Sequence, residues 1–194
     1  MKLKLLGLGL SAALFTTITM AKPVAYQIDP THTATVFTWD HFGFSKPSGN
    51  FSNIQGTIHV DNEKPSQSSV NVEIDINSLN TNVKALDEHL LKDPKFFDAA
   101  NFPKATFKST KVETKDKKNF KITGNLTLKG VTKPVVLNAV LNKQANHPMA
   151  NVPAIGFDAT TSFKRSDFNI AEYVPNVGDK ITIKITTEAT VPAK

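Results

Sequence analysis

The sequence contains no cysteine among its 194 residues. This absence excludes a disulfide-stapled scaffold, a thiolate zinc or redox site, and a lipoprotein anchored through an N-terminal cysteine. Arginine is almost absent as well: Arg165 is the only one, and the other basic residues counted with it are all lysines. The net charge of +6 is mild, and Lys2 and Lys4 supply two of those charges. Without an arginine-rich stripe and interleaved aromatic side chains, we predict no nucleic-acid partner.

The longest apolar run lies at the N-terminus and is too short to span a membrane, which takes about 20 residues. Lys2 and Lys4 precede it, residues 5–18 form the apolar stretch, and small residues end it at Ala21. This arrangement is typical of a secretory signal peptide. We therefore predict a signal peptide over residues 1–21 and a soluble periplasmic or secreted protein after cleavage. No repeat or linker divides residues 22–194, so we predict one domain there.

No familiar catalytic signature occurs: G-x-S-x-G, H-E-x-x-H, the P-loop and G-x-G-x-x-G are all missing. The five histidines are not paired at i, i+2 or i, i+4, so their spacing favours no metal site. A transition-metal site built from histidines distant in sequence stays open as an alternative. We predict that Asp–His neighbours such as Asp40-His41 are satisfied hydrogen-bonding residues. We expect a protein that is not an enzyme, with no catalytic residues, no metal and no cofactor.

Most of the chain alternates apolar and polar residues with a period of two, the pattern of half-buried β-strands. The clearest case is residues 70–77, and residues 120–129, 135–141, 155–163 and 181–189 repeat it. Residues 33–44 are also rich in β-forming residues, and we expect a strand there with Phe42 and Phe44 facing inward. About eight antiparallel strands fit either a sandwich or a closed barrel. The short connections favour an up-and-down barrel.

One segment, residues 81–102, does not have the strand pattern. Three of its apolar residues share the spacing of one helical face: Val83, Leu86 and Leu90. Asn80 or Thr81 is placed to cap the start of this helix, and Pro94 is placed to end it. A short helix with an apolar face must pack against other apolar surface. We predict a helical lid across one end of the barrel.

Arg165 continues the inward register of residues 155–163. A guanidinium on an inward register is costly unless it is paired, and its fork geometry suits a carboxylate or another anionic group. The sequence leaves two partners open. We favour a carboxylate of Asp87, Asp93 or Asp98, which would pin the lid to the barrel. The alternative is a ligand head group at the barrel mouth.

Five ordered motifs spread over nearly the whole chain after residue 21 make the sequence resemble the YceI-like family. They are Tyr26-Gln27-Ile28-Asp29 with His32, Asp87-x-His89-Leu90 with Phe96-Phe97-Asp98, Phe102-Pro103 with Phe107-x-Ser109-Thr110, Gly124-Asn125-Leu126-Thr127-Leu128-x-Gly130-Val131-Thr132, and Arg165-x-Asp167-Phe168. The resemblance implies an exported, lipocalin-like, eight-stranded antiparallel β-barrel. It also implies an elongated apolar cavity that binds a polyisoprenoid or a similar long amphiphile.

The function that we predict is therefore a binding protein. It would hold a polyisoprenoid, an isoprenoid quinone or a fatty-acid derivative in the barrel lumen, for transport, storage or sequestration. The alternatives are an enzyme acting on a lipid head group and a stress-related interaction protein with a filled barrel. The predicted partner is the long-chain ligand, and the sequence leaves both transient contact with a membrane surface and a homodimer open.

The candidate site has two parts. The predicted ligand-binding side chains are Phe37, Trp39, Phe42, Phe44, Leu86, Leu90, Phe96, Phe97, Phe157 and Phe163. The residues predicted to hold a head group or to pin the lid are Asp87, His89 and Arg165. For each apolar side chain, ordinary core packing is the competing interpretation, and only an unfilled lumen separates the two.

Overall fold

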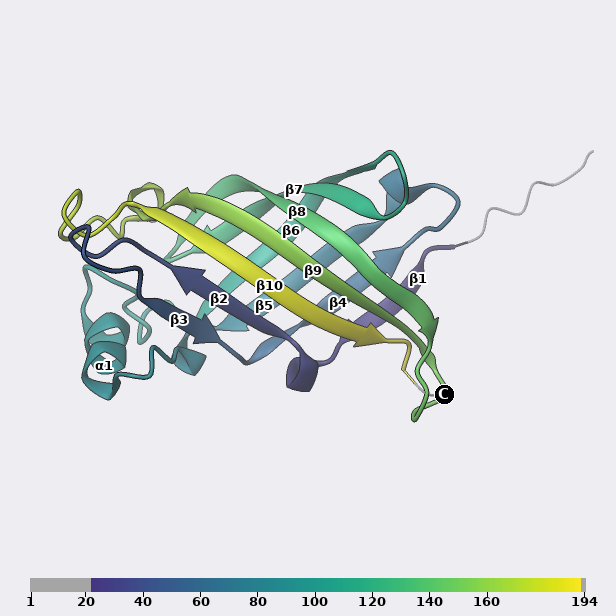
Figure 1. Ribbon diagram of the computed structural model, residues 1–194, viewed down its shortest axis with the longest axis horizontal. Helices are drawn as coiled ribbons and strands as arrows, with labels where there is room; N and C mark the ends of the chain where they lie inside the picture. Colours follow the sequence, from purple (N-terminus) through teal and green to yellow (C-terminus); the bar gives the residue numbers. More distant parts are fainter. Residues whose placement is uncertain (1–21, 193–194) are drawn as a thin grey trace, which may run out of the picture.

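The segments with period-two alternation pair as antiparallel strands of one sheet, which closes on itself in the computed structural model of this chain (Figure 1). The structure describes residues 22–192. The strands are β1 Val24–Ile28, β2 Ala34–Thr38, β3 Ser48–Phe51, β4 Ile54–Val60, β5 Ser69–Asp75, β6 Lys104–Thr114, β7 Asn119–Leu128, β8 Val131–Asn146, β9 Pro153–Lys164 and β10 Lys180–Thr190. The helices are η1 Pro30–His32, η2 Pro65–Gln67, η3 Ile76–Ser78, α1 Lys84–Lys92 and η4 Arg165–Phe168.

The ten labelled strands form a barrel of eight because two barrel strands are each interrupted once. β1 and β2 both pair with β10: Gln27 lies opposite Thr190, and Thr35 lies opposite Ile185. β4 pairs with β1, and β3 pairs with β2. Around the ring, segments that follow one another in sequence are always neighbours. The predicted lipocalin-like, up-and-down, eight-stranded barrel is therefore confirmed.

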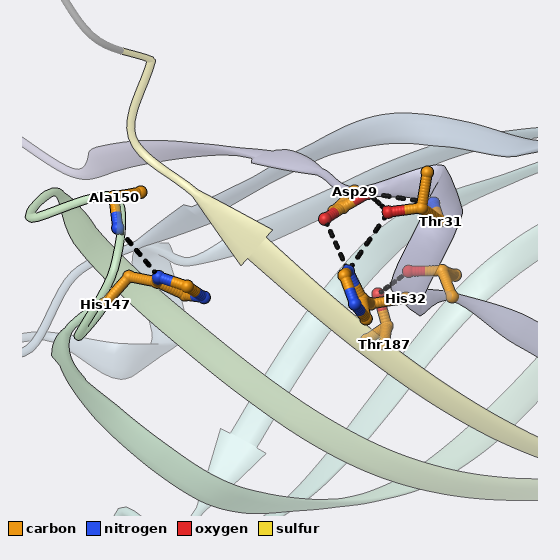
Figure 2. Close-up of polar contacts among 7 residues, drawn as sticks. Asp29, Thr31, His32, His147, Ala150 and Thr187 are labelled. Atoms are coloured by element: carbon orange, nitrogen blue, oxygen red, sulfur yellow. Dashed lines mark hydrogen bonds and ion pairs between the residues drawn. The ribbon is translucent and has the colours of Figure 1, made fainter.

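The interruption between β1 and β2 is built around Asp29, which caps η1. Its Oδ1 accepts hydrogen bonds from the backbone N of Thr31 at 2.8 Å and from Oγ1 of Thr31 at 2.6 Å (Figure 2). Its Oδ2 lies 2.8 Å from Nδ1 of His32. Pro30 suits the first turn because it has no backbone N–H to leave unpaired. These local bonds stabilise the segment in which the chain leaves its pairing with β10 at the end of β1, before it pairs with β10 again as β2.

One end of the barrel is filled by side chains. Tyr26, Ile28, Ile58, Ile155 and Ala189 come from β1, β4, β9 and β10 and form a buried cluster. Ala189 is next to the last residue of β10, Thr190, and β10 ends near the C-terminus in Figure 1, so this cluster lies at that end of the barrel. A second and larger cluster runs along the rest of the lumen and includes the lid.

The lid helix α1 lies at the opposite end of the barrel (Figure 1). It ends at Lys92, with Asp93 as its C-cap before Pro94, as predicted. The predicted N-cap is wrong, because Val83 occupies that position and makes no side-chain capping bond. Instead, Oδ1 of Asp87 accepts hydrogen bonds from the backbone N and Oγ1 of Thr81. Within residues 22–192, no helix has the length and apolarity needed to cross a membrane.

Candidate functional site

The barrel encloses a cavity of about 620 Å³, within the range of roughly 300–1,000 Å³ that small-molecule sites occupy. Alternate side chains of each strand point inward, and nearly all of those that line the cavity are aliphatic or aromatic. The polar side chains in the lining are Thr33, Thr35, His41, His89, Thr161, Arg165, Tyr173 and Thr187. The interior is therefore suited to an apolar ligand with few polar groups.

Small side chains keep the middle of the lumen open. Ala139 on β8 lies directly opposite Ala159 on β9, and Ala105, the second residue of β6, lines the cavity nearer the lid. All three are buried, and none of them fills the space that a larger inward side chain would occupy. An eight-stranded barrel has just enough interior for packed side chains or for one ligand. Because the alanines leave interior volume unfilled, this barrel is suited to hold a ligand rather than a fully packed core.

The mouth of the cavity lies at the lid end. Four residues line the cavity and are also exposed to solvent: His41, Val83, His89 and Tyr173. They come from the β2–β3 turn, the start and body of α1, and the loop between η4 and β10. These three segments meet at the same end of the barrel in Figure 1. Solvent therefore reaches the cavity between the lid and the two loops, while the opposite end is filled.

Eight of the ten predicted apolar side chains face the cavity. Phe37 and Trp39 lie on or just after β2, Leu86 and Leu90 on α1, Phe96 and Phe97 just after α1, and Phe157 and Phe163 on β9. Several of these aromatic rings contact one another. The Phe37 ring stacks on Trp39 and on Phe51, at centroid distances of 5.6 and 5.5 Å. Phe51 meets Phe97 edge-on, which joins the barrel wall to the segment after the lid. Contact of these side chains with a ligand stays a prediction.

The predicted inward positions of Phe42 and Phe44 are wrong. β2 ends at Thr38, and a tight turn follows in which Phe42 and Gly43 have positive φ angles of 54° and 74°. Oδ1 of Asp40 accepts a hydrogen bond from Gly43 N at 2.8 Å and fixes this turn. The Phe42 and Phe44 side chains are 52% and 92% exposed, and neither lines the cavity. Both rings lie outside the barrel, next to its mouth.

The predicted carboxylate partner of Arg165 is also wrong. Arg165 is buried and lines the cavity, as its register predicts, but its guanidinium donates to four backbone carbonyls. Nε reaches Gly178 O at 3.0 Å, Nη1 reaches Ile170 O at 2.9 Å, and Nη2 reaches both Glu172 O and Val177 O at 2.8 Å. Arg165 thus organises the loop after η4 rather than pinning the lid. Burial lowers the pKa of Arg165, and the charge of Asp179 opposes this effect.

Asp87 and His89 separate in the structure. The Asp87 carboxylate is engaged by Thr81 and does not line the cavity. The His89 ring borders the mouth, lies edge-on against Phe96 at a centroid distance of 5.0 Å, and places Nδ1 4.0 Å from Oδ2 of Asp93. His89 and Arg165 are thus the predicted head-group residues that reach the cavity. In the part of the chain that the structure describes, no three His, Asp or Glu side chains are placed to hold a metal ion.

The threonines inside the barrel are not among the predicted site residues. Oγ1 of Thr33 and Oγ1 of Thr187 lie 2.9 Å apart and share a hydrogen bond where β2 begins beside β10 (Figure 2). Thr35 and Thr161 also line the cavity, on β2 and β9. The signal was present, because these residues have the same strand parity as the apolar side chains that face inward. Threonine is so common in strands that parity alone did not single them out.

Comparisons with known proteins agree with this barrel. The family model described as the YceI-like domain matches residues 26–189. The YceI protein of Salmonella arizonae is 40% identical over 190 residues, which is 97% of each chain. The crystal structure of Burkholderia cenocepacia BcnA matches with a TM-score of 0.75 at 23% identity, over 84% of this chain and 99% of that one.

A polyisoprenoid-binding domain from Saccharophagus degradans has the same fold, with a TM-score of 0.67 at 15% identity, over 87% of this chain and 99% of that one. At such identities the two solved structures support the fold alone. The family model, in contrast, covers nearly all of the barrel, and the Salmonella relative aligns along almost its whole length. The chain therefore belongs to the YceI-like family.

Proposed function

We propose that this protein binds one long-chain apolar amphiphile in the barrel lumen. The observation that carries the proposal is the cavity of about 620 Å³, with its almost entirely apolar lining and one open end. Membership of the YceI-like family points to a binding protein rather than an enzyme. The Saccharophagus domain with the same fold is described as polyisoprenoid-binding. A polyisoprenoid, an isoprenoid quinone or a fatty-acid derivative would suit the lumen of this chain.

The affinity for such a ligand comes mainly from burial of its chain. Each buried methylene contributes about 0.8 kcal/mol, so a long chain binds well with few polar contacts. A head group left at the mouth would meet His89 and Arg165. A guanidinium has five N–H donors, and four of those of Arg165 are used by loop carbonyls. The head group would therefore orient the ligand and add a smaller share of the binding free energy.

We also propose that the protein works in the periplasm or after secretion, where it transports, stores or sequesters its ligand. The signal peptide predicted over residues 1–21 lies outside the described residues. An amphiphile of low solubility is most concentrated in membranes, so transient contact with a membrane surface fits this role. The exposed Phe42, Phe44 and Tyr173 near the mouth support such contact, because aromatic side chains favour the membrane–water interface.

Organic extraction of the purified mature protein, followed by mass spectrometry, tests the proposal. We expect a long-chain lipid in a near-equimolar amount. The matched control is protein carrying Ala159→Trp, which places a large side chain in the open middle of the lumen. Absence of lipid from the parent protein, together with no binding of added long-chain isoprenoids, would contradict the proposal. It would favour a filled barrel that acts through its surface.

A further inference from the structure

The cavity has a clear lower boundary where the filled end of the barrel begins. On β9, Phe157 lines the cavity, whereas Ile155, two residues nearer the filled end on the same face, does not. On β10, Thr187 lines the cavity and Ala189 does not. Ile155 and Ala189 are only 3% and 0% exposed, so the space around them is filled. The cavity therefore ends between these two layers of inward side chains.

Five side chains form this boundary, which we call the floor of the cavity. They line the cavity and also belong to, or pack against, the buried cluster that fills the barrel end: Ile28, Ile58, Val70, Val72 and Phe157. Phe157 is the largest of the five, and it is half-buried, whereas Ile28 and Ile58 are buried. Since Phe157 faces inward, its remaining free surface is directed to the lumen. Its ring is therefore the largest part of the floor that a ligand can meet.

The Phe157 ring is supported from the filled side. Its centroid lies 6.0 Å from that of Phe120 on β7, and the two rings meet edge-on. β8 separates β7 from β9, which places the two strands about 10 Å apart, so the rings lean toward each other across β8. Phe120 does not line the cavity, although Ile122, the next inward residue of β7, does. Packing below the floor therefore fixes the position of the Phe157 ring.

Polar contacts do not set the depth that a chain can reach. Thr33 and Thr187 share a hydrogen bond with each other. Oγ1 of Thr35 and Oγ1 of Thr161 have no partner in the described part of the chain, but both atoms are covered by their neighbours. The floor itself is apolar. A chain that enters from the mouth therefore stops where it meets apolar surface.

We propose that Phe157 limits the length of the ligand chain that this protein binds. The inference rests on the proposed function, with the head group at the mouth and the end of the chain directed to the floor. Phe157 is the first large side chain below Ala159 on the inward face of β9. Methylenes that fit between the mouth and this ring are buried and add to the affinity, whereas further methylenes stay outside the mouth and add little.

The test titrates saturated fatty acids of increasing chain length against the lipid-stripped protein. Their carboxylates stay at the mouth, because an anion gains no counter-charge in an apolar lumen, so each chain enters with its methyl end first. The affinity of the parent should rise with chain length and then level off, and the length at which it levels off is the limit. Phe157→Ala should move this limit to longer chains by about two methylenes or more, so that a chain two methylenes beyond the parent limit binds the variant up to about fifteenfold more tightly.

Phe157→Trp tests the same limit in the opposite direction. Its larger ring should shorten the limiting chain. This variant decides the question even where neighbouring side chains collapse into the space that Phe157→Ala leaves. A limit that neither variant moves would refute the role of Phe157 and leave the carrier function standing. If the parent binds none of the fatty acids and no long-chain isoprenoid, both proposals fail.

The matched control is Phe163→Ala, the same change on the same strand at the lid end. Phe163 also lines the cavity, one residue before β9 ends at Lys164. Its loss removes apolar contact near the mouth, so the affinity for all chain lengths should fall by a similar factor while the limit stays where it is. If Phe163→Ala and Phe157→Ala move the limit equally, total cavity volume sets the chain length, and the proposal is refuted.

Discussion

Nη1 of Arg165 donates a 2.9 Å hydrogen bond to the backbone carbonyl of Ile170 inside the barrel. Three further carbonyls accept from the same guanidinium, those of Glu172, Val177 and Gly178. The loop that these four carbonyls belong to forms one side of the cavity mouth. Arg165 is therefore the residue whose loss should loosen the mouth most.

Replacing Arg165 with Leu leaves four carbonyls with a lost donor and should reduce the free energy of unfolding by about 3 kcal/mol or more. Arg165→Lys keeps the charge but not the fork, so it should recover only part of the loss. Urea denaturation measures both effects. Lys164→Leu, a change of the exposed neighbouring residue, is the control and should stay within about 0.5 kcal/mol of the parent. Parent-like stability of Arg165→Leu would show that the carbonyls find other partners.

Because Asp29 and His32 form an ion pair, we predict that the stability of the corner between β1 and β2 depends on pH. Hydrogen bonds from Thr31, and then from His32, lower the pKa of Asp29 to about 2. The hydrogen bond to Asp29 in turn raises the pKa of His32 above its ordinary value of 6.5. The stabilisation from Asp29 is thus present above its ordinary pKa of 3.8 and is lost as the pH falls toward 2. The contribution of His32 is full below 6.5 and is lost as the pH rises through its raised pKa.

NMR titration of the His32 ring tests this relationship. Asp29→Asn should lower the pKa of His32, because the carboxylate that favours the imidazolium is gone. Thr31→Val is the matched variant: it removes the largest cause of the Asp29 shift, so the pKa of Asp29 should rise while His32 keeps its partner. A His32 pKa at or below 6.5 in the parent would contradict the ion pair.

Strand parity explains why so much of the cavity could be predicted from sequence. Because successive side chains alternate between faces, Phe157, Ala159 and Phe163 must share one face once the strand forms. Helical spacing placed Leu86 and Leu90 on the barrel side of the lid for the same reason. Both periodicities are local properties of the sequence. Once the sheet closes into a barrel, they determine which side chains face the lumen and which face away from it.

The errors come from features that have no such period. The turn at Phe42 requires a positive φ in a residue that is not glycine. Such residues seldom adopt a positive φ, so a run of β-forming residues does not indicate a turn there. The partners of Arg165 are backbone carbonyls, and every residue has one, so composition cannot identify them. The unpaired state of the Thr161 hydroxyl depends on Ile183 across the ladder, a neighbour that only the register supplies.

The exposed rings at the mouth predict faster exchange of ligand with membranes. Phe44 is 92% exposed and lies in the turn next to the opening. Phe44→Ser should slow transfer of a bound lipid from the protein to vesicles by several-fold, because an exposed ring favours the interface. The equilibrium affinity for the same lipid in solution should not change, since Phe44 does not line the cavity.

Met149→Ser is the matched control for Phe44→Ser. Met149 is equally exposed, at 90%, but it lies in the β8–β9 loop near the C-terminus, at the filled end of the barrel (Figure 1). Its loss should leave the transfer rate unchanged. Equal slowing by both variants would mean that surface apolarity in general, and not contact at the mouth, sets the rate.

The last prediction concerns chain length. If burial of the chain drives binding, affinity should rise with each added methylene by up to about fourfold, the equivalent of about 0.8 kcal/mol. The rise should stop once the lumen of about 620 Å³ is filled. Ala159→Trp should abolish binding of long chains, because it places a large side chain from β9, beside Ala139, in the open middle of the lumen. Ser162→Trp, on the exposed outer face of the same strand, should bind as the parent does. An affinity that does not change with chain length would mean that the head group, and not the lumen, determines binding.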